Sequence, residues 1–236
     1  MSVELVAQTF IRPEFTDSTM IKFTDMDNRE KLNPSMSPDI LAEAAGRICY
    51  ASYHLPNEKT KENADYLQSI KEKYHFSVLE HSSFTFLITG VSRVLLAEIS
   101  RHRHHSFSVR SQRYCNESDS RTIIPPVIKS HMDDHAVHDA MEDYIKLQHQ
   151  SRRVYKKIQG ALLGLGLDRK TANDAARYVL LEGTETELFI TANGRSWIDF
   201  LSKRDSEGAA IEIRNLAGLI SEALKKAAPH TFNGEK

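Results

Sequence analysis

The side chains best suited to chemistry lie in one run of fourteen residues, 101–114, which reads RHRHHSFSVRSQRY. The run holds four arginines, three histidines and no acidic residue, in a chain whose formal net charge is −1. A guanidinium group donates several hydrogen bonds in a rigid plane and stays protonated, which suits phosphates and other oxyanions. The run therefore predicts a site for an anionic ligand.

Other interpretations of this run have less support. Arginines in a basic segment commonly belong to a solvated surface. A zinc site built from His102, His104 and His105 lacks the HExxH spacing or the cysteine pair that usually accompanies such a centre, so we expect no metal. A nucleic-acid-binding module would stack bases on Phe107 and Tyr114. The net charge of −1 argues against this module, and we expect no nucleic-acid partner.

Two candidate nucleophiles, Ser111 and Cys115, lie near the end of this run. A serine nucleophile needs a general base within hydrogen-bond reach, and the sequence shows no histidine placed in that way. We therefore interpret Ser111 as a hydrogen-bond donor to the ligand and Cys115 as a structural thiol. The only other cysteine is Cys49, so a disulfide framework is not expected and both thiols should be free.

The composition of the 236 residues is typical of a globular protein, with 40% hydrophobic and 27% charged residues. No hydrophobic run is long enough to cross a membrane, and the first residues, MSVELVAQTF, lack the features of a signal peptide. We therefore expect a cytoplasmic protein without a membrane partner.

Periodic patterns predict many helices and few strands, in a single α+β domain over residues 1–236. The sheet is expected to be small and antiparallel, with several helices flanking it and one long helix among them. Charge order along the long helix, acidic first and basic later, is favourable for the helix dipole. Strands are expected at 83–89 and 186–192, an extended segment at 122–128, and helices at 38–53, 57–74 (with Asn57 as a possible cap), 91–100, 130–160, 168–181, around Ser196, and at 207–227.

The motif RHR at 101–103, followed after seven residues by Ser111, resembles the signature of flavin-dependent thymidylate synthases, and QRY at 112–114 continues the match. Five further blocks resemble the same family in the same order. They are HFSVLEHSSFTFLITGVSR (75–93), DSRTIIPP (119–126), AARYVL (175–180), ANGRSWIDF (192–200) and KRDSEGAAIEIR (203–214). The resemblance thus covers most of residues 40–225.

This resemblance implies an enzyme that makes dTMP from dUMP by activating the uracil ring without an enzyme nucleophile. Methylenetetrahydrofolate is the implied carbon donor, reduced FAD the hydride donor and NADPH the reductant. The implied assembly is a homotetramer whose active sites are shared between subunits. A relative of the same fold that binds FAD and oxidises NADPH, but no longer methylates, is the alternative.

The resemblance also implies the roles of single residues, with Arg204 as the catalytic residue that helps to ionise the uracil at N3. Cofactor contacts are implied for Ser77, Arg101, His102, Arg103, Val109, Asn193, Gly194, Arg195 and Asp199. Substrate contacts are implied for Glu98, Arg101, Val109, Arg110, Ser111, Gln112, Arg113, Arg177 and Arg204.

Three positions depart from the family pattern. Val109 stands where relatives commonly carry Glu or Gln, Gly208 where a His is frequent, and Leu181 where a Pro is frequent. Val109 is the most consequential of the three, because a valine can neither donate nor accept a hydrogen bond within the signature.

Overall fold

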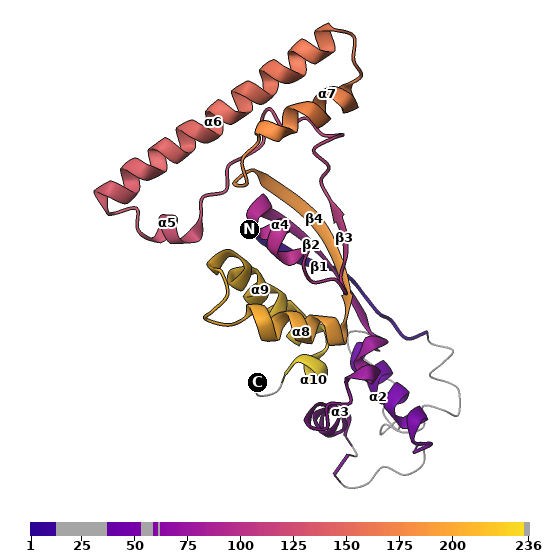
Figure 1. Cartoon of the computed structure of the whole chain (residues 1–236). Coiled ribbons are helices and arrows are strands. Elements are labelled where there is room, and N and C mark those ends of the chain that lie inside the picture. The colour runs from indigo at the N-terminus through magenta and orange to yellow at the C-terminus, as the bar shows by residue number, and fades with distance from the viewer. Residues whose placement is uncertain (13–36, 53–58, 61, 234–236) are drawn as a thin grey trace.

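The computed structural model describes residues 1–12, 37–52, 59–60 and 62–233. A four-stranded antiparallel sheet in the order β1-β2-β4-β3 forms its centre, with helices on several sides (Figure 1). The strands are β1 (Ser2–Gln8), β2 (Ser83–Ser92), β3 (Ser106–Val109) and β4 (Glu185–Asn193).

The two central strands show why this sheet has one core face. Along β4, buried and more accessible residues alternate, so Leu188 and Ile190 point to the core while Phe189 remains 45% exposed. On the accessible face, the hydroxyl oxygens of Thr85 and Thr191 lie 2.9 Å apart across the β2–β4 pair. The apolar face of the sheet is therefore the one that needs covering.

Strand β2 was expected to end at residue 89, but it continues through Gly90 to Ser92. The β2–β4 register shifts between Ile88 and Val91, and Gly90 has a φ of 68°, a left-handed conformation that glycine adopts at little cost. Pairing then resumes up to Ser92, whose side chain accepts a hydrogen bond from the Leu95 amide and caps the next helix. The central strand β2 and the helix that leads to the arginine run (residues 101–114) are thus joined directly.

Three helices cover the core face of the sheet: α4 (Arg93–Ile99), α8 (Gly194–Arg204) and α9 (Ile211–Ala227). Trp197 and Phe200 of α8 are fully buried, and the Trp197 ring packs edge-on against Phe86 of β2 with centroids 5.2 Å apart. From α9, Leu216 and Ile220 complete this main core. Burial of these large side chains is the main stabilising term of the layer.

A second helical layer lies at one end of the sheet (Figure 1). It consists of α2 (Ser37–Cys49), α3 (Asn63–Glu72), the 3₁₀ helix η4 (Phe76–Glu80) and α10 (Pro229–Phe232). Asp39 is fully buried there, and it accepts hydrogen bonds from the amides of His230 and Thr231 and from the Thr231 hydroxyl. This carboxylate fastens α10 to α2.

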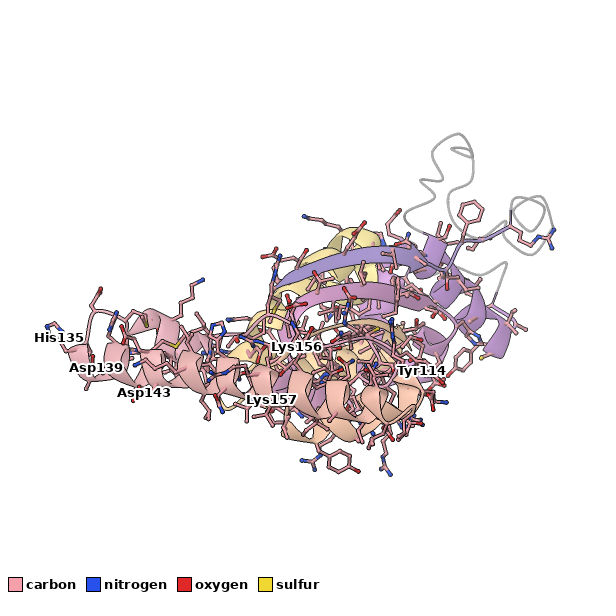
Figure 2. All side chains as sticks on the ribbon, turned by 90° about the horizontal axis from the view of Figure 1, so that it is seen from above. Tyr114, His135, Asp139, Asp143, Lys156 and Lys157 are labelled. Carbon is pink, nitrogen blue, oxygen red and sulfur yellow. The ribbon has the colours of Figure 1, made fainter. Side chains whose placement is uncertain are left out.

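The remaining helices are α5 (Pro126–Ser130), α6 (His135–Gly164), α7 (Arg169–Ala176) and the 3₁₀ helix η5 (Arg177–Val179). Figure 2 shows α6 extending beyond the rest of the molecule, with His135, Asp139 and Asp143 toward its projecting end. Its other half packs against α7, where Tyr155 is fully buried. Among the described residues, no helix has the length and apolarity to span a membrane.

The structure confirms the predicted α+β class, with a small antiparallel sheet, flanking helices and one long helix. Two strands were missed, β1 at the sheet edge and β3 inside the arginine run itself. The segment 122–128 was expected to be extended, but α5 begins within it at Pro126 because proline is well suited to the first turn of a helix.

Several helix boundaries were also wrong. The long helix begins at His135, after a turn, because Asp134 accepts hydrogen bonds from the amides of Ala136 and Val137. Its first turn carries no acidic residue and its last turn no basic one, so the dipole argument fails for the helix ends. The helix expected over 57–74 covers Asn63–Glu72, and its proposed Asn57 cap lies outside the described residues. The helix expected to reach residue 53 ends at Cys49.

Candidate active site

The turn that follows α4 separates the first five residues of the arginine run into two groups. His102 and His105 are buried, whereas Arg101, Arg103 and His104 are exposed. The His105 ring packs edge-on against Trp197, with centroids 4.8 Å apart, and lies 5.7 Å from the His102 ring. The turn therefore places cations at the surface and neutral rings in the core.

Arg204, at the end of α8, is held by two groups of different kinds. Its Nε donates to Nε2 of His102 at 3.0 Å, and its Nη1 donates to Oε1 of Glu98 at 3.2 Å. The Arg204 side chain is 22% exposed, so one edge of the guanidinium group reaches the surface. Its Nη2 has no hydrogen-bond partner among the described residues. The group is thus fixed in direction and can still donate to a ligand.

Burial keeps both inward-facing histidines neutral. Desolvation lowers the pKa of His102, and the adjacent Arg204 lowers it further. Desolvation, reinforced by His102, lowers the pKa of His105 to about 4. Neither ring nitrogen of His105 has a hydrogen-bond partner in the described structure. Because Nε2 of His102 accepts the proton of Arg204, the ring must carry its own proton on Nδ1.

The first turn of α8 forms the opposite wall. Asn193 caps the helix by accepting a hydrogen bond from the Ser196 amide at 2.9 Å. A Cβ at Gly194 would lie 2.8 Å from the Leu79 carbonyl oxygen, so the close approach of η4 requires glycine here. Arg195 pairs with Glu80 at 2.6 Å. The first-turn amides of a helix carry partial positive charge, which adds to that of the arginines.

These walls enclose a polar cavity of about 710 Å³, called here the Arg204 pocket. Its lining consists of Glu80, Arg101, His102, Arg103, His104, His105, Asn193, Arg195, Ser196, Asp199, Lys203 and Arg204. Within the described part of the chain, Arg101 and Arg103 have no ion-pair partner. The pocket thus presents unpaired guanidinium groups beside a helix N-terminus, an arrangement suited to a phosphate-bearing ligand.

Strand β3 carries the chain from this pocket to a second group of polar side chains. Ser111 and Arg113 follow the strand, and Arg113 Nε lies 3.2 Å from Oδ1 of Asp174 on α7. Arg177 reaches the same oxygen at 2.9 Å. We call Ser111, Arg113, Asp174 and Arg177 the Arg113 cluster. It shares no residue with the lining of the Arg204 pocket.

A buried amide holds the loop of this cluster in place. Asn173 is fully buried, and its Nδ2 donates to the carbonyl oxygens of Arg113 (3.1 Å) and Cys115 (3.4 Å). Its Oδ1 accepts from the Tyr155 hydroxyl and from Gln159 of α6. Both ends of the amide are therefore used, and the loop is fastened to two helices at once.

Arg110 lies next to this loop but faces other carboxylates. It contacts Glu117 and Glu187, both at 3.3 Å. Glu117 is fully buried, and desolvation raises the pKa of its carboxyl group. The carbonyl oxygen of Arg110 in turn accepts a hydrogen bond from Arg93. Arg110 is thus engaged by two carboxylates within the fold.

The structure divides the predicted site residues among several places. Six predicted cofactor contacts line the Arg204 pocket together with Arg204: Arg101, His102, Arg103, Asn193, Arg195 and Asp199. Gly194 opens α8 beside it, and Glu98 reaches it through Arg204. Ser77 lies in a neighbouring cavity of about 330 Å³ that shares Arg195. Ser111, Arg113 and Arg177 gather in the Arg113 cluster.

Val109 and Gln112 line a third cavity, of about 490 Å³, together with Leu181. Val109 is partly buried against the main core, and its backbone pairs with Leu188 in the sheet. Two of the three departures from the family pattern therefore meet in one cavity. The third, Gly208, is exposed, and a side chain there would meet open space.

Sequence reasoning missed several polar residues of these sites. Glu80, Ser196 and Lys203 line the Arg204 pocket, and Lys203 pairs with Asp199 at 2.7 Å. The i,i+4 spacing of Asp199 and Lys203 could have indicated that pair. The i,i+3 spacing of Asp174 and Arg177 could also have indicated that pair. No sequence pattern indicates the contacts of Asn173 with the carbonyl oxygens of Arg113 and Cys115, because these residues are about sixty positions away.

The metal-ligating side chains are dispersed in the part of the chain that the structure describes. In residues 1–12, 37–52, 59–60 and 62–233, no group of three His, Cys, Asp or Glu side chains is arranged to hold a metal ion. His102 and His105 face the core while His104 faces solvent. Cys49 and Cys115 are free thiols, as predicted.

The fold and the two sites define a class: an α+β protein whose exposed guanidinium groups are arranged for phosphate-bearing ligands. Residues 31–230 match the family model described as thymidylate synthase complementing protein. The chain is 39% identical to a probable flavin-dependent thymidylate synthase of Mycobacterium phage L5, covering 98% of this chain and 96% of that one. It is 40% identical to flavin-dependent thymidylate synthase of Mycobacterium tuberculosis strain H37Rv, over 98% and 88% of the two chains.

A solved structure shares the fold. Flavin-dependent thymidylate synthase from Helicobacter pylori, complexed with FAD and dUMP, aligns with a TM-score of 0.66 at 24% identity, over 99% of this chain and 98% of that one. The chain described here belongs to the flavin-dependent thymidylate synthase family.

Proposed function

We propose that the protein converts dUMP to dTMP, with methylenetetrahydrofolate as carbon donor, FAD as the resident cofactor and NADPH as reductant. Family membership supports the reaction class. The observation that carries the assignment to residues is the fixed guanidinium group of Arg204, held by Glu98 and His102 at the rim of a cationic pocket.

The residues of the Arg204 pocket fit FAD. A dinucleotide carries a pyrophosphate, and Arg101, Arg103 and the first turn of α8 offer fixed donors and positive charge to it. The volume of about 710 Å³ is in the range of pockets that hold sizeable ligands. When bound and reduced, FAD supplies the hydride that completes the methyl group.

For dUMP, we assign the phosphate to the Arg113 cluster and the uracil to Arg204. A hydrogen bond to a charged group contributes about 1.5–3 kcal/mol, so two guanidinium groups and a hydroxyl form a strong phosphate site. Within one chain, the Arg113 cluster shares no residue with the lining of the Arg204 pocket. We infer that a complete site combines the Arg113 cluster of one subunit with the Arg204 pocket of another, in a homotetramer.

Arg204 has the geometry for activating the uracil ring. Negative charge that develops on the ring and its carbonyl oxygens is stabilised by a permanent cation that needs no reorganisation. Neutral His102 accepts a hydrogen bond from Nε and Glu98 accepts one from Nη1, so Nη2 is the nitrogen left to donate to a ligand. The proposal uses no serine or cysteine nucleophile. Ser111 acts as a hydrogen-bond donor to the phosphate.

The test is a pair of assays on the purified protein with added FAD. After removal of free FAD, we expect the protein to keep flavin absorbance at about 450 nm. We expect dTMP formation only when dUMP, methylenetetrahydrofolate and NADPH are all present. NADPH oxidation without dTMP would instead identify the non-methylating relative. Failure to retain FAD and to form dTMP would refute the proposal.

A further inference from the structure

Asp174 occupies the position between the two arginines that we assign to the substrate phosphate. Its Oδ1 lies 3.2 Å from Nε of Arg113 and 2.9 Å from Nη2 of Arg177. A single carboxylate oxygen thus contacts both guanidinium groups. It marks the point at which these two cations converge.

These contacts are ionic and weakly directed. Oδ1 is covered by its surroundings, yet neither guanidinium approaches it with the geometry of a hydrogen bond. All three side chains are partly exposed, between 37% and 45%. Ion pairs at such exposure are worth little, because water and salt screen them. A ligand with more charge and better hydrogen-bond geometry can therefore replace this carboxylate.

The other cations at this loop have contacts of their own, and Lys170 Nζ lies 5.0 Å from the centroid of the Tyr114 ring. Arg110 is engaged by Glu117 and Glu187. Arg113 and Arg177 together with Asp174 then sum to a charge of +1. Removal of the carboxylate would raise this sum to +2.

We propose that Asp174 is an internal anion that holds the two arginines together in the empty enzyme and gives them up when the substrate phosphate binds. This inference rests on the proposed function, because it takes the Arg113 cluster to be the phosphate site. Asp174 therefore acts as a specificity-determining residue. A phosphate dianion displaces the carboxylate, whereas chloride and other weak monoanions do not.

Asp174→Asn keeps the size of the side chain and removes its charge. The variant should bind dUMP about 3- to 10-fold more tightly, since a like charge close to the phosphate is lost. Chloride should weaken dUMP binding more steeply in the variant than in the wild type, because chloride no longer competes with a built-in anion. Affinity for deoxyuridine, which lacks the phosphate, should not change.

The experiment is a calorimetric titration of the FAD-loaded enzyme with dUMP, deoxyuridine and inorganic phosphate, at low and high chloride. Asp139→Asn serves as the matched control, since Asp139 is an exposed carboxylate on the projecting part of α6 (Figure 2). Asp174→Ser provides a second neutral variant. The control should behave as the wild type in every titration.

The outcomes separate this inference from the proposed function. If the wild type binds dUMP and both neutral variants bind it more weakly or equally well, Asp174 is a fixed support and the inference is wrong. If the wild type binds no dUMP, the proposed function fails. The inorganic phosphate titrations would then still decide whether Asp174 competes with an anion at these arginines.

Discussion

At the scale of single residues, Arg204 shows how a fold directs a cation that has to act on a ligand. An exposed arginine samples many rotamers, whereas this one donates to a neutral imidazole and to a carboxylate at once. The two contacts engage Nε and Nη1, and Nη2 has no hydrogen-bond partner among the described residues. We assign Nη2 to the uracil.

Arg204→Lys should lower the rate of dTMP formation by about 10²–10³, because an ammonium group cannot keep both contacts and also reach the ligand. FAD binding should largely persist, since Arg101, Arg103 and Arg195 remain. Steady-state turnover and flavin retention measure the two effects. Turnover equal to that of the wild type would remove Arg204 from the catalytic role.

Burial of His105 should make the stability of the fold depend on pH, and the direction of this dependence can be predicted. Burial holds the pKa of His105 at about 4 in the folded state, below the ordinary histidine value of 6.5. Between these two values the unfolded chain binds a proton that the folded chain does not, so stability falls as the pH falls through this window. Near pH 5, His105 alone lowers the free energy of unfolding by about 2 kcal/mol.

His105→Phe should remove that loss. Both ring nitrogens of His105 lack partners, so phenylalanine abandons no hydrogen bond and keeps the contact with Trp197. Urea unfolding midpoints at about pH 7 and about pH 5 should differ less for the variant than for the wild type. An unchanged difference would show that other groups control the acid sensitivity.

At the scale of elements, α7 supports the loop that carries Ser111 and Arg113. Asn173 donates to two carbonyl oxygens of this loop and accepts from α6, so its removal would leave buried polar groups without partners. Each buried polar group left without a partner lowers the free energy of unfolding by about 1–3 kcal/mol. We expect the loss of the Asn173 side chain to displace the loop before it affects the rest of the fold.

Asn173→Ala should therefore raise the KM for dUMP more than it lowers kcat at saturation, while FAD binding changes little. Asn116→Ala is a suitable control, because Asn116 is exposed and bonds only locally within the same loop. Equal losses of FAD and dUMP binding would indicate general unfolding and contradict a positioning role.

Local patterns predicted the long elements well, because their burial follows the helical or strand period. They missed β3, since Ser106–Val109 is short and lies within a charged run whose composition hides its pairing with β4. The family resemblance named Arg204 and the arginines. It could not show that His102 faces inward as an acceptor, which depends on the tertiary contact with Arg204. The contacts of Asn173 with the loop, and that of Asp174 with Arg113, were missed for the same reason, although the i,i+3 spacing of Asp174 and Arg177 is a local pattern.

At the scale of the whole molecule, the Arg204 pocket and the Arg113 cluster are two separate groups of predicted site residues on one chain, and we propose that assembly brings them together across subunits. Two inactive variants, Arg204→Ala and Arg113→Ala, should then complement each other. After the two are unfolded and refolded as a mixture, some sites combine two intact halves, and dTMP formation should return. Mixtures that stay inactive despite forming tetramers would place each complete site within one chain.

The four residues of β3 also fix a length. They lie between the turn at 101–105 and the loop that begins at Arg110, and their pairing with β4 prevents them from sliding. The strand therefore sets the spacing within the signature, between the arginines that we assign to FAD and the residues that we assign to the dUMP phosphate. Inserting or deleting one residue here would turn Phe107 and Val109 to the opposite face of the sheet. It would also move the loop that begins at Arg110 by about 3.3 Å along the strand, relative to the turn at 101–105. Homologous chains should accordingly vary the side chains within this stretch far more freely than its length.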